Sequence, residues 1–184
     1  MRRVIILALA ALLLAGCAAM GERQPHRFYV LEPRPQAGME RGSALVSPAA
    51  TTAASFYDTQ DIVYSRTPGT RGYYQFNHWT ERPQRVMHVA LAARYGAGSG
   101  RYILATHVVE IYHDAAQAPG MSRITVMAEL AEPARRTVVA RASFSCEAPA
   151  ASHDAPGAVT GFDEAAGCVV DDIAAWADRE VAAR

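Results

Sequence analysis

The segment that decides the fold is the first of three similar apolar stretches in the second half of the chain, Tyr102-Ile103-Leu104-Ala105-Thr106-His107-Val108-Val109-Glu110-Ile111-Tyr112-His113. Large apolar side chains alternate along it without Gly or Pro, which is typical of a half-buried strand. Ser122 to Leu130 and Arg136 to Cys146 repeat this pattern. A loop at Asp114 to Gly120 and a tight turn at Glu132-Pro133 join the three stretches, so the sequence predicts an antiparallel meander. In the third stretch the alternation predicts these inward side chains: Val138, Ala140, Ala142, Phe144 and Cys146.

Shorter strands are predicted on the N-terminal side of this meander. β-Branched and aromatic residues indicate strands at His26 to Leu31 and at Ser43 to Ser47, whereas the small and polar stretch Ala49 to Ser55 indicates a loop. Two further runs, Asp61 to Arg66 and Gly72 to His78, flank a Pro-Gly pair that is typical of a tight turn. These two runs predict a hairpin.

Two segments have helical periodicity. In the first, Thr80 is a candidate N-cap and Pro83 lies early in a helix that extends to about Tyr95 with one apolar face. The second is expected at Asp163 to Ala183, after a stretch rich in Ala, Pro and Gly that indicates a loop at Ala148 to Gly161. The sequence therefore predicts an α+β fold, in which an antiparallel or mixed sheet carries two main helices on one face of a single domain.

The first residues of the chain predict a secretory signal of the lipoprotein type. Arg2 and Arg3 precede an apolar run of about 11 residues, which is too short for a membrane-spanning helix of about 20 residues. Leu14-Ala15-Gly16-Cys17 has the arrangement of a bacterial lipobox, in which Cys17 carries acyl chains such as palmitate after cleavage. We therefore expect a signal peptide at 1–16, a lipidated Cys with a short tether at 17–25, and one domain at 26–184. Ala18 follows the Cys, and by resemblance to lipoprotein sorting this favours the outer membrane, with the domain facing the periplasm.

The composition excludes several classes of function. The 184 residues carry 18 basic and 18 acidic side chains, and none of the basic ones is Lys. A phosphate-binding Walker A loop needs a Lys, and nucleic-acid binding needs clustered cations, so neither is expected.

Cys146 and Cys168 form a candidate disulfide, because an oxidising periplasm favours pairing of two isolated cysteines. Two buried thiols remain the alternative. A zinc site is disfavoured, since no Cys-x-x-Cys pair or neighbouring His pair completes a set of four ligands.

No catalytic or metal-binding motif is convincing. His107, Glu110 and His113 are spread over about 20 Å of a strand, with Glu110 expected on the opposite face, so we expect solvent-facing or edge histidines. Ser99 follows a helix, which is the wrong order for a nucleophile elbow, and the adjacent Asp171 and Asp172 diverge on a helix and indicate a solvated face. We predict a protein that is not an enzyme and has no metal site and no cofactor.

The densest feature is a band of aromatic residues on and around the predicted hairpin. Both faces of its second strand carry aromatic side chains, so one face can pack into the core while the other contacts a partner. Core packing alone is the alternative. For Trp79 and Arg82 we favour structural roles over partner contact. The candidate partner surface consists of Tyr64, Tyr73, Tyr74, Phe76, Trp79 and Arg82.

Two motifs in this band carry a family resemblance. Asp61 to Arg66, followed by the aromatic strand from Tyr73 and the Trp79-Thr80-Glu81-Arg82-Pro83 junction, resembles the ABC-type transport auxiliary lipoprotein family, the PqiC-like proteins. The lipobox, Phe28 to Leu31 and the final amphipathic helix fall in the order that this family has.

The resemblance implies a periplasmic lipoprotein that works with an ABC permease, its ATPase and an MCE-domain protein in lipid transport between two membranes. We expect the domain to dock the MCE partner near the outer membrane through its aromatic hairpin. A lipid-binding shuttle with an apolar cavity, or a structural envelope lipoprotein without a transport role, are the alternatives. The sequence leaves self-association into a homo-oligomer open.

Overall fold

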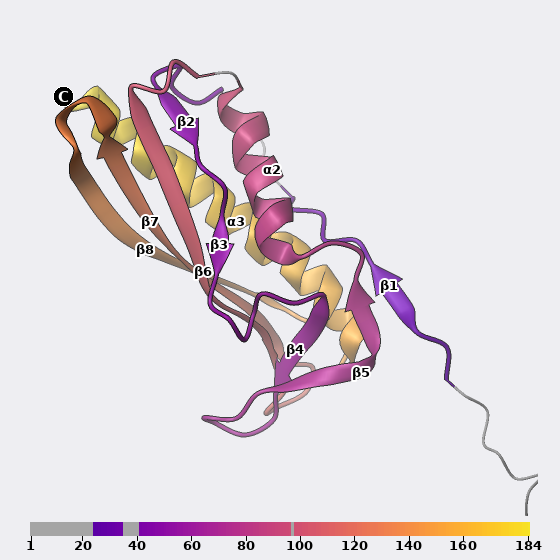
Figure 1. Ribbon diagram of the computed structural model, residues 1–184. Helices are drawn as coiled ribbons and strands as arrows, with labels where there is room; N and C mark the ends of the chain where they lie inside the picture. The colour runs from indigo at the N-terminus through magenta and orange to yellow at the C-terminus, as the bar shows by residue number, and fades with distance from the viewer. Residues whose placement is uncertain (1–23, 35–40, 97) are drawn as a thin grey trace, which may run out of the picture.

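The computed structural model describes residues 24–34, 41–96 and 98–184. The predicted signal peptide, Cys17 and the tether up to residue 23 lie outside these residues. A mixed eight-stranded sheet has the order β1-β5-β4-β6-β7-β8, with β2 and β3 paired to β6, and the two α-helices of the described chain lie on one face of it (Figure 1). The α+β fold predicted from the sequence is therefore confirmed.

The element bounds follow the predicted order along the chain. The strands are β1 (Arg27–Tyr29), β2 (Val46–Pro48), β3 (Thr52–Ala53), β4 (Asp61–Ser65), β5 (Gly72–Trp79), β6 (Tyr102–Asp114), β7 (Met121–Glu132) and β8 (Thr137–Pro149). The helices are α2 (Pro83–Tyr95) and α3 (Ala155–Ala182), and a short 3-10 helix, η2 (Pro133–Arg135), forms the turn between β7 and β8. β3 lies inside the stretch that was expected to be a loop. It forms because it pairs with β6, and the local sequence carries no signal for this long-range contact.

The meander of β6, β7 and β8 is antiparallel, as predicted, and buries one face. Leu104 lies opposite Leu130, and Val126 lies opposite Phe144. The prediction for Val138 is wrong, since this side chain is 45% exposed. The pairing of β7 with β8 shifts register between Leu130 and Ala131, and such a bulge exchanges the two faces of a strand beyond it.

α3 begins at Ala155, so the loop predicted up to Gly161 is wrong over its second half. The Asp154 side chain caps the helix by accepting a hydrogen bond of 3.0 Å from the Gly157 N–H. The small residues of this stretch serve close packing: the Ser122 hydroxyl donates to the Ala158 carbonyl at 2.7 Å, and a Cβ on Gly161 would crowd the Ser122 side chain. Composition typical of loops therefore marks close contact between helix and sheet here.

α2 ends where predicted, but it begins two residues later than a helix capped by Thr80 would. Its N-cap residue is Arg82, without a side-chain cap, and Thr80 lies outside the helix, where its backbone N–H donates to the Tyr29 carbonyl at 2.8 Å. The expected apolar face is buried, and its last residue, Tyr95, donates a hydrogen bond of 3.1 Å to the Ala174 carbonyl of α3. Burial raises the pKa of the Tyr95 hydroxyl.

One hydrophobic core joins the sheet with both helices. Trp79, at the end of β5, packs edge-to-face on Phe162 of α3 with ring centroids 5.5 Å apart. None of the helices in the described ranges combines the length and the apolar character that crossing a bilayer requires.

Candidate interaction site

The aromatic band lies where the regular sheet ends. β5 pairs with β4 through Gly72, Tyr73 and His78, and its last three residues pair with β1. A register shift on β4 between Asp61 and Val63 leaves the middle of β5 without β4 partners. Irregular pairing of this kind bends and twists a strand. The aromatic side chains of β5 consequently enter three different surroundings rather than forming one surface.

The first surrounding is open to solvent. Phe56 and Tyr73 stack with ring centroids 4.9 Å apart and an interplanar angle of 15°, and their exposed fractions are 39% and 41%. The Tyr73 hydroxyl also donates to the Phe56 carbonyl at 3.3 Å. We call these two residues the exposed aromatic pair.

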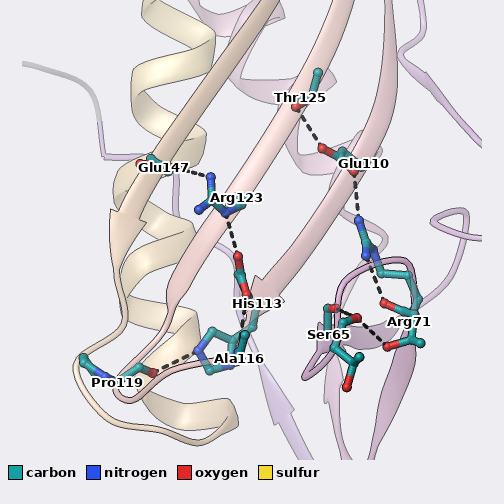
Figure 2. Close-up of polar contacts among 12 residues, drawn as sticks. Ser65, Arg71, Glu110, His113, Ala116, Pro119, Arg123, Thr125 and Glu147 are labelled. Atoms are coloured by element: carbon teal, nitrogen blue, oxygen red, sulfur yellow. Dashed lines mark hydrogen bonds and ion pairs between the residues drawn. The ribbon is translucent and has the colours of Figure 1, made fainter.

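Arg71 links the exposed aromatic pair to the sheet through Tyr57. Its Nε donates to the Tyr57 hydroxyl at 3.0 Å, and its guanidinium carbon lies 3.7 Å from the ring centroid of Tyr112. Its Nη2 donates to Glu110 at 3.1 Å, and Glu110 in turn accepts from the Thr125 hydroxyl at 3.4 Å (Figure 2). Since Tyr57 also packs edge-on against Phe56, the exposed aromatic pair is held on β6 rather than on a free loop.

The second surrounding is the inside of the hairpin. The rings of Tyr64 and Tyr74 lie 4.8 Å apart, and the Tyr74 hydroxyl is 2.7 Å from His113 Nδ1. Burial raises the pKa of Tyr74 to about 12. The other ring nitrogen of His113 donates to the Pro119 carbonyl at 3.1 Å (Figure 2), so a neutral imidazole satisfies both contacts. Burial lowers the pKa of His113.

The expectation that His113 faces solvent is therefore wrong, since its exposed fraction is 0%. β6 shifts register between Val108 and Glu110, which places Glu110 on the same outer face as His107 and turns His113 inward. His107 makes a contact of 2.8 Å with Thr52 instead. The three residues do not converge on one point.

The third surrounding lies between β5 and the start of the domain. Phe76 contacts the His26 ring edge-on at 5.6 Å, and His26 Nδ1 lies 2.7 Å from His78 Nε2. His78 Nδ1 lies 2.8 Å from Asp61. Sequence spacing carries no signal for this group, because parallel pairing of β1 with β5 joins residues 52 positions apart.

The two remaining residues of the candidate surface have mainly structural contacts. Trp79 is 2% exposed and lies in the core. Arg82 pairs with Asp58 at 3.0 Å, and Asp58 also accepts from the Gln84 side chain at 2.6 Å. Sequence reasoning missed Phe56 and Arg71 as members of the site, since their roles depend on contacts with β5 and β6.

The two cysteines of the domain are joined in a disulfide between β8 and α3, with a Cα–Cα distance of 6.2 Å. Asp172 lies beside them and completes the sole group of three candidate metal ligands found in the described residues. Bonded sulfur atoms do not supply thiolates, so this group does not fit a metal ion. Asp171, expected on a solvated face, is 7% exposed, because the surface of α3 at this position faces α2 and Pro33, which follows β1.

Comparison with known proteins supports the fold and identifies the family. Two crystal structures share the fold: a protein from Xanthomonas campestris assigned to DUF330 (21% identity, 85% of this chain and 98% of that chain, TM-score 0.76) and an uncharacterized protein (14% identity, 86% and 99%, TM-score 0.61). No curated protein matches the chain. Residues 29–174 match the family described as the ABC-type transport auxiliary lipoprotein component. This match spans the sheet, α2 and most of α3, and the chain belongs to the ABC-type transport auxiliary lipoprotein family.

Proposed function

We propose that the protein is anchored through acylated Cys17 in the outer membrane, where its periplasmic domain docks an MCE-domain protein that works with an ABC permease and its ATPase in lipid transport. Membership of a transport auxiliary family supports a role beside a transporter rather than as an enzyme. The proposal goes beyond family membership in two respects, since it names an MCE-domain protein as the partner and the outer membrane as the location.

The observation that carries the proposal is the exposed aromatic pair. Large aromatic side chains at the surface are typical contact residues of protein interfaces, where they supply much apolar area for little loss of conformational freedom. Arg71 bonds to Tyr57, which packs on Phe56, and Phe56 stacks on Tyr73. Binding of a partner therefore does not have to order the two exposed rings further. A partner would cover rings that are now about two-fifths exposed.

The shuttle alternative finds less support. The groove between α2 and α3 has a volume of about 350 Å³ and is lined by small apolar residues such as Ala90, Ala93 and Val170. Its wall also includes Arg94 and Asp171. Ionisable side chains make the wall of this groove less apolar than a site for an acyl chain is expected to be.

The proposal is tested by affinity capture of the tagged lipoprotein from crosslinked, detergent-solubilised membranes, with mass spectrometry of the recovered proteins and lipids. We expect the wild-type protein to recover an MCE-domain protein and a permease, and Tyr73→Ser to recover neither. Tyr73 is the right position because its ring is exposed, whereas a Trp79 substitution would damage the core.

Val89→Ser is the matched control, since Val89 is 59% exposed on α2 and lies outside the aromatic band. Equal recovery of the transporter by both variants would exclude docking through the exposed aromatic pair. Recovery of stoichiometric lipid without any transporter protein would favour the shuttle.

A further inference from the structure

A second exposed apolar surface lies at the very start of the domain. Phe28 and Val30 are two residues apart in an extended segment, and their exposed fractions are 64% and 55%. Tyr29 and Leu31, on the opposite side, pack against or within the core. β1 therefore has the alternation of a half-buried strand, but the face turned away from the core is apolar instead of polar.

β5 extends this surface. Phe28 lies opposite His78 in the parallel ladder, with ring centroids 5.4 Å apart, and Phe76 contacts His26. We call His26, Phe28, Val30, Phe76 and His78 the β1–β5 patch. It is separate from the exposed aromatic pair, which is linked to β6 through Tyr57 and Arg71.

We propose that the β1–β5 patch lies on the surface of the bilayer that holds Cys17. This inference rests on the proposed lipid anchor. Eight residues, Ala18 to Pro25, separate Cys17 from His26, and even a fully extended chain between these two residues spans only about 30 Å. β1 is also the first strand of the described chain (Figure 1), so it is the strand fewest residues away from the proposed anchor.

Three of the four imidazole nitrogens of the patch already have hydrogen-bond partners, which suits contact with a bilayer interface. If His78 donates from Nδ1 to Asp61, its Nε2 can accept the proton of His26 Nδ1, so a chain of hydrogen bonds satisfies three of the four ring nitrogens. Asp61 is held in turn by the Thr59 hydroxyl at 3.1 Å. The imidazole rings can thus approach a less polar environment without leaving these groups unpaired.

Basic side chains border the patch. Arg27, exposed on β1, lines one surface hollow with Phe76, and Arg82 lines another with His26, Phe28 and His78. An apolar surface edged by guanidinium groups has the composition of segments that lie in the headgroup region, where cations meet lipid phosphates. Asp58 and Asp61 also line this hollow, so we expect shallow contact rather than insertion.

The test uses a Trp reporter in the full-length lipidated protein, reconstituted in vesicles of phosphatidylethanolamine and phosphatidylglycerol with brominated phosphatidylcholine as quencher. Phe28→Trp and Val30→Trp place a ring in the patch, and Val89→Trp is the equally exposed control on α2. The native Trp79 and Trp176 are 2% and 9% exposed and give a constant background. We expect brominated lipid to reduce the added emission of both patch reporters by about twofold more than that of the control.

Equal quenching of the patch and control reporters, or no quenching of either patch reporter, would overturn the inference. Intact mass of the N-terminal peptide is measured on the same samples. Acylated Cys17 with unquenched reporters refutes the patch alone, whereas an unmodified Cys17 refutes the lipid anchor and the patch together.

Discussion

The two ends of the sheet differ in how regularly their strands pair. β6, β7 and β8 are 13, 12 and 13 residues long and pair along nearly their whole lengths. At the other end, β1, β4 and β5 are 3, 5 and 8 residues long; β5 pairs with β4 only near its two ends and with β1 only over its last three residues.

The surface chemistry of the two ends also differs. The outer face of the long strands carries ion pairs such as Arg141 with Glu129 at 2.8 Å and Arg123 with Glu147 (Figure 2), beside the exposed side chains of Met127 and Val138. The irregular end exposes aromatic rings, those of Phe28, Phe56 and Tyr73. The long strands therefore act as a scaffold, and the surfaces suited to contact lie where the ladder is interrupted, because a bent strand can display side chains that a flat one would bury.

The strongest test of this comparison is whether the two ends fold as one unit. Trp79 belongs to the irregular end but packs on Phe162 of α3, so Trp79→Ala should lower the free energy of unfolding by about 3–5 kcal/mol. Urea unfolding followed by far-UV and near-UV circular dichroism should show one transition. Two separated transitions would mean that the ends are independent.

The disulfide is expected to stabilise the scaffold end. Cys146 and Cys168 are 22 positions apart, and closure of such a loop contributes roughly 3 kcal/mol in the chain-entropy model. The double variant Cys146→Ser/Cys168→Ser should lose about this amount and no longer respond to dithiothreitol in urea unfolding. A wild-type protein that is indifferent to the reductant would contradict a stabilising bond.

His113 links the ends through Tyr74, and it should make stability depend on pH. Because its pKa is lowered in the folded protein, the unfolded chain takes up a proton first as pH falls below about 6.5. Stability should then decline until the pH passes the lowered folded value, by about 1.4 kcal/mol for each unit of depression. Unfolding measured from pH 7 to 5 should be less steep in His113→Gln than in the wild type, and parallel curves would refute this origin.

The cap of α3 should have a smaller effect. Asp154→Ala should cost about 1 kcal/mol by removing the bond to the Gly157 N–H, while Asp154→Asn should retain most of it. Hydrogen bonds from Ser152 and Gly157 lower the pKa of Asp154, so its contribution is present at neutral pH and is lost as pH falls through that lowered value. Thermal unfolding of the two variants at neutral pH distinguishes capping from helix propensity.

Removal of an exposed aromatic ring should affect stability least. Tyr73→Ser should lower the free energy of unfolding by less than about 1 kcal/mol, although we expect it to abolish capture of the transporter. Urea unfolding beside the capture experiment checks both parts. A large loss of stability would show that Tyr73 belongs to the scaffold and not to a contact surface.

The sequence predicted the fold well where one periodic pattern of apolar residues extends over many positions. Alternation identified β6, β7 and β8, and helical periodicity identified α2 with its start placed about two residues too early. It was wrong where a single inserted residue reverses a face, as at Val138 and His113, because bulges leave no trace in an apolar pattern. It was also wrong at the start of α3, where Gly and Ala serve close packing rather than a loop.

The candidate site could be predicted in composition but not in arrangement. Tyr73 and Arg82 are exposed, whereas Trp79 is buried and Tyr74 turns inward to His113. Neighbouring positions on one strand diverge because β5 is unpaired with β4 in its middle, and this register shift has no signal in the local sequence.

By itself, the sequence determined the α+β fold, the three long strands and the family, since periodic burial and local motifs are properties of consecutive residues. Only the tertiary structure decided which aromatic side chains stay exposed, that Arg71 holds them to β6, and that His26, His78 and Asp61 form a chain of hydrogen bonds. These features join residues tens of positions apart, and their energies depend on distances that exist only after the strands have paired.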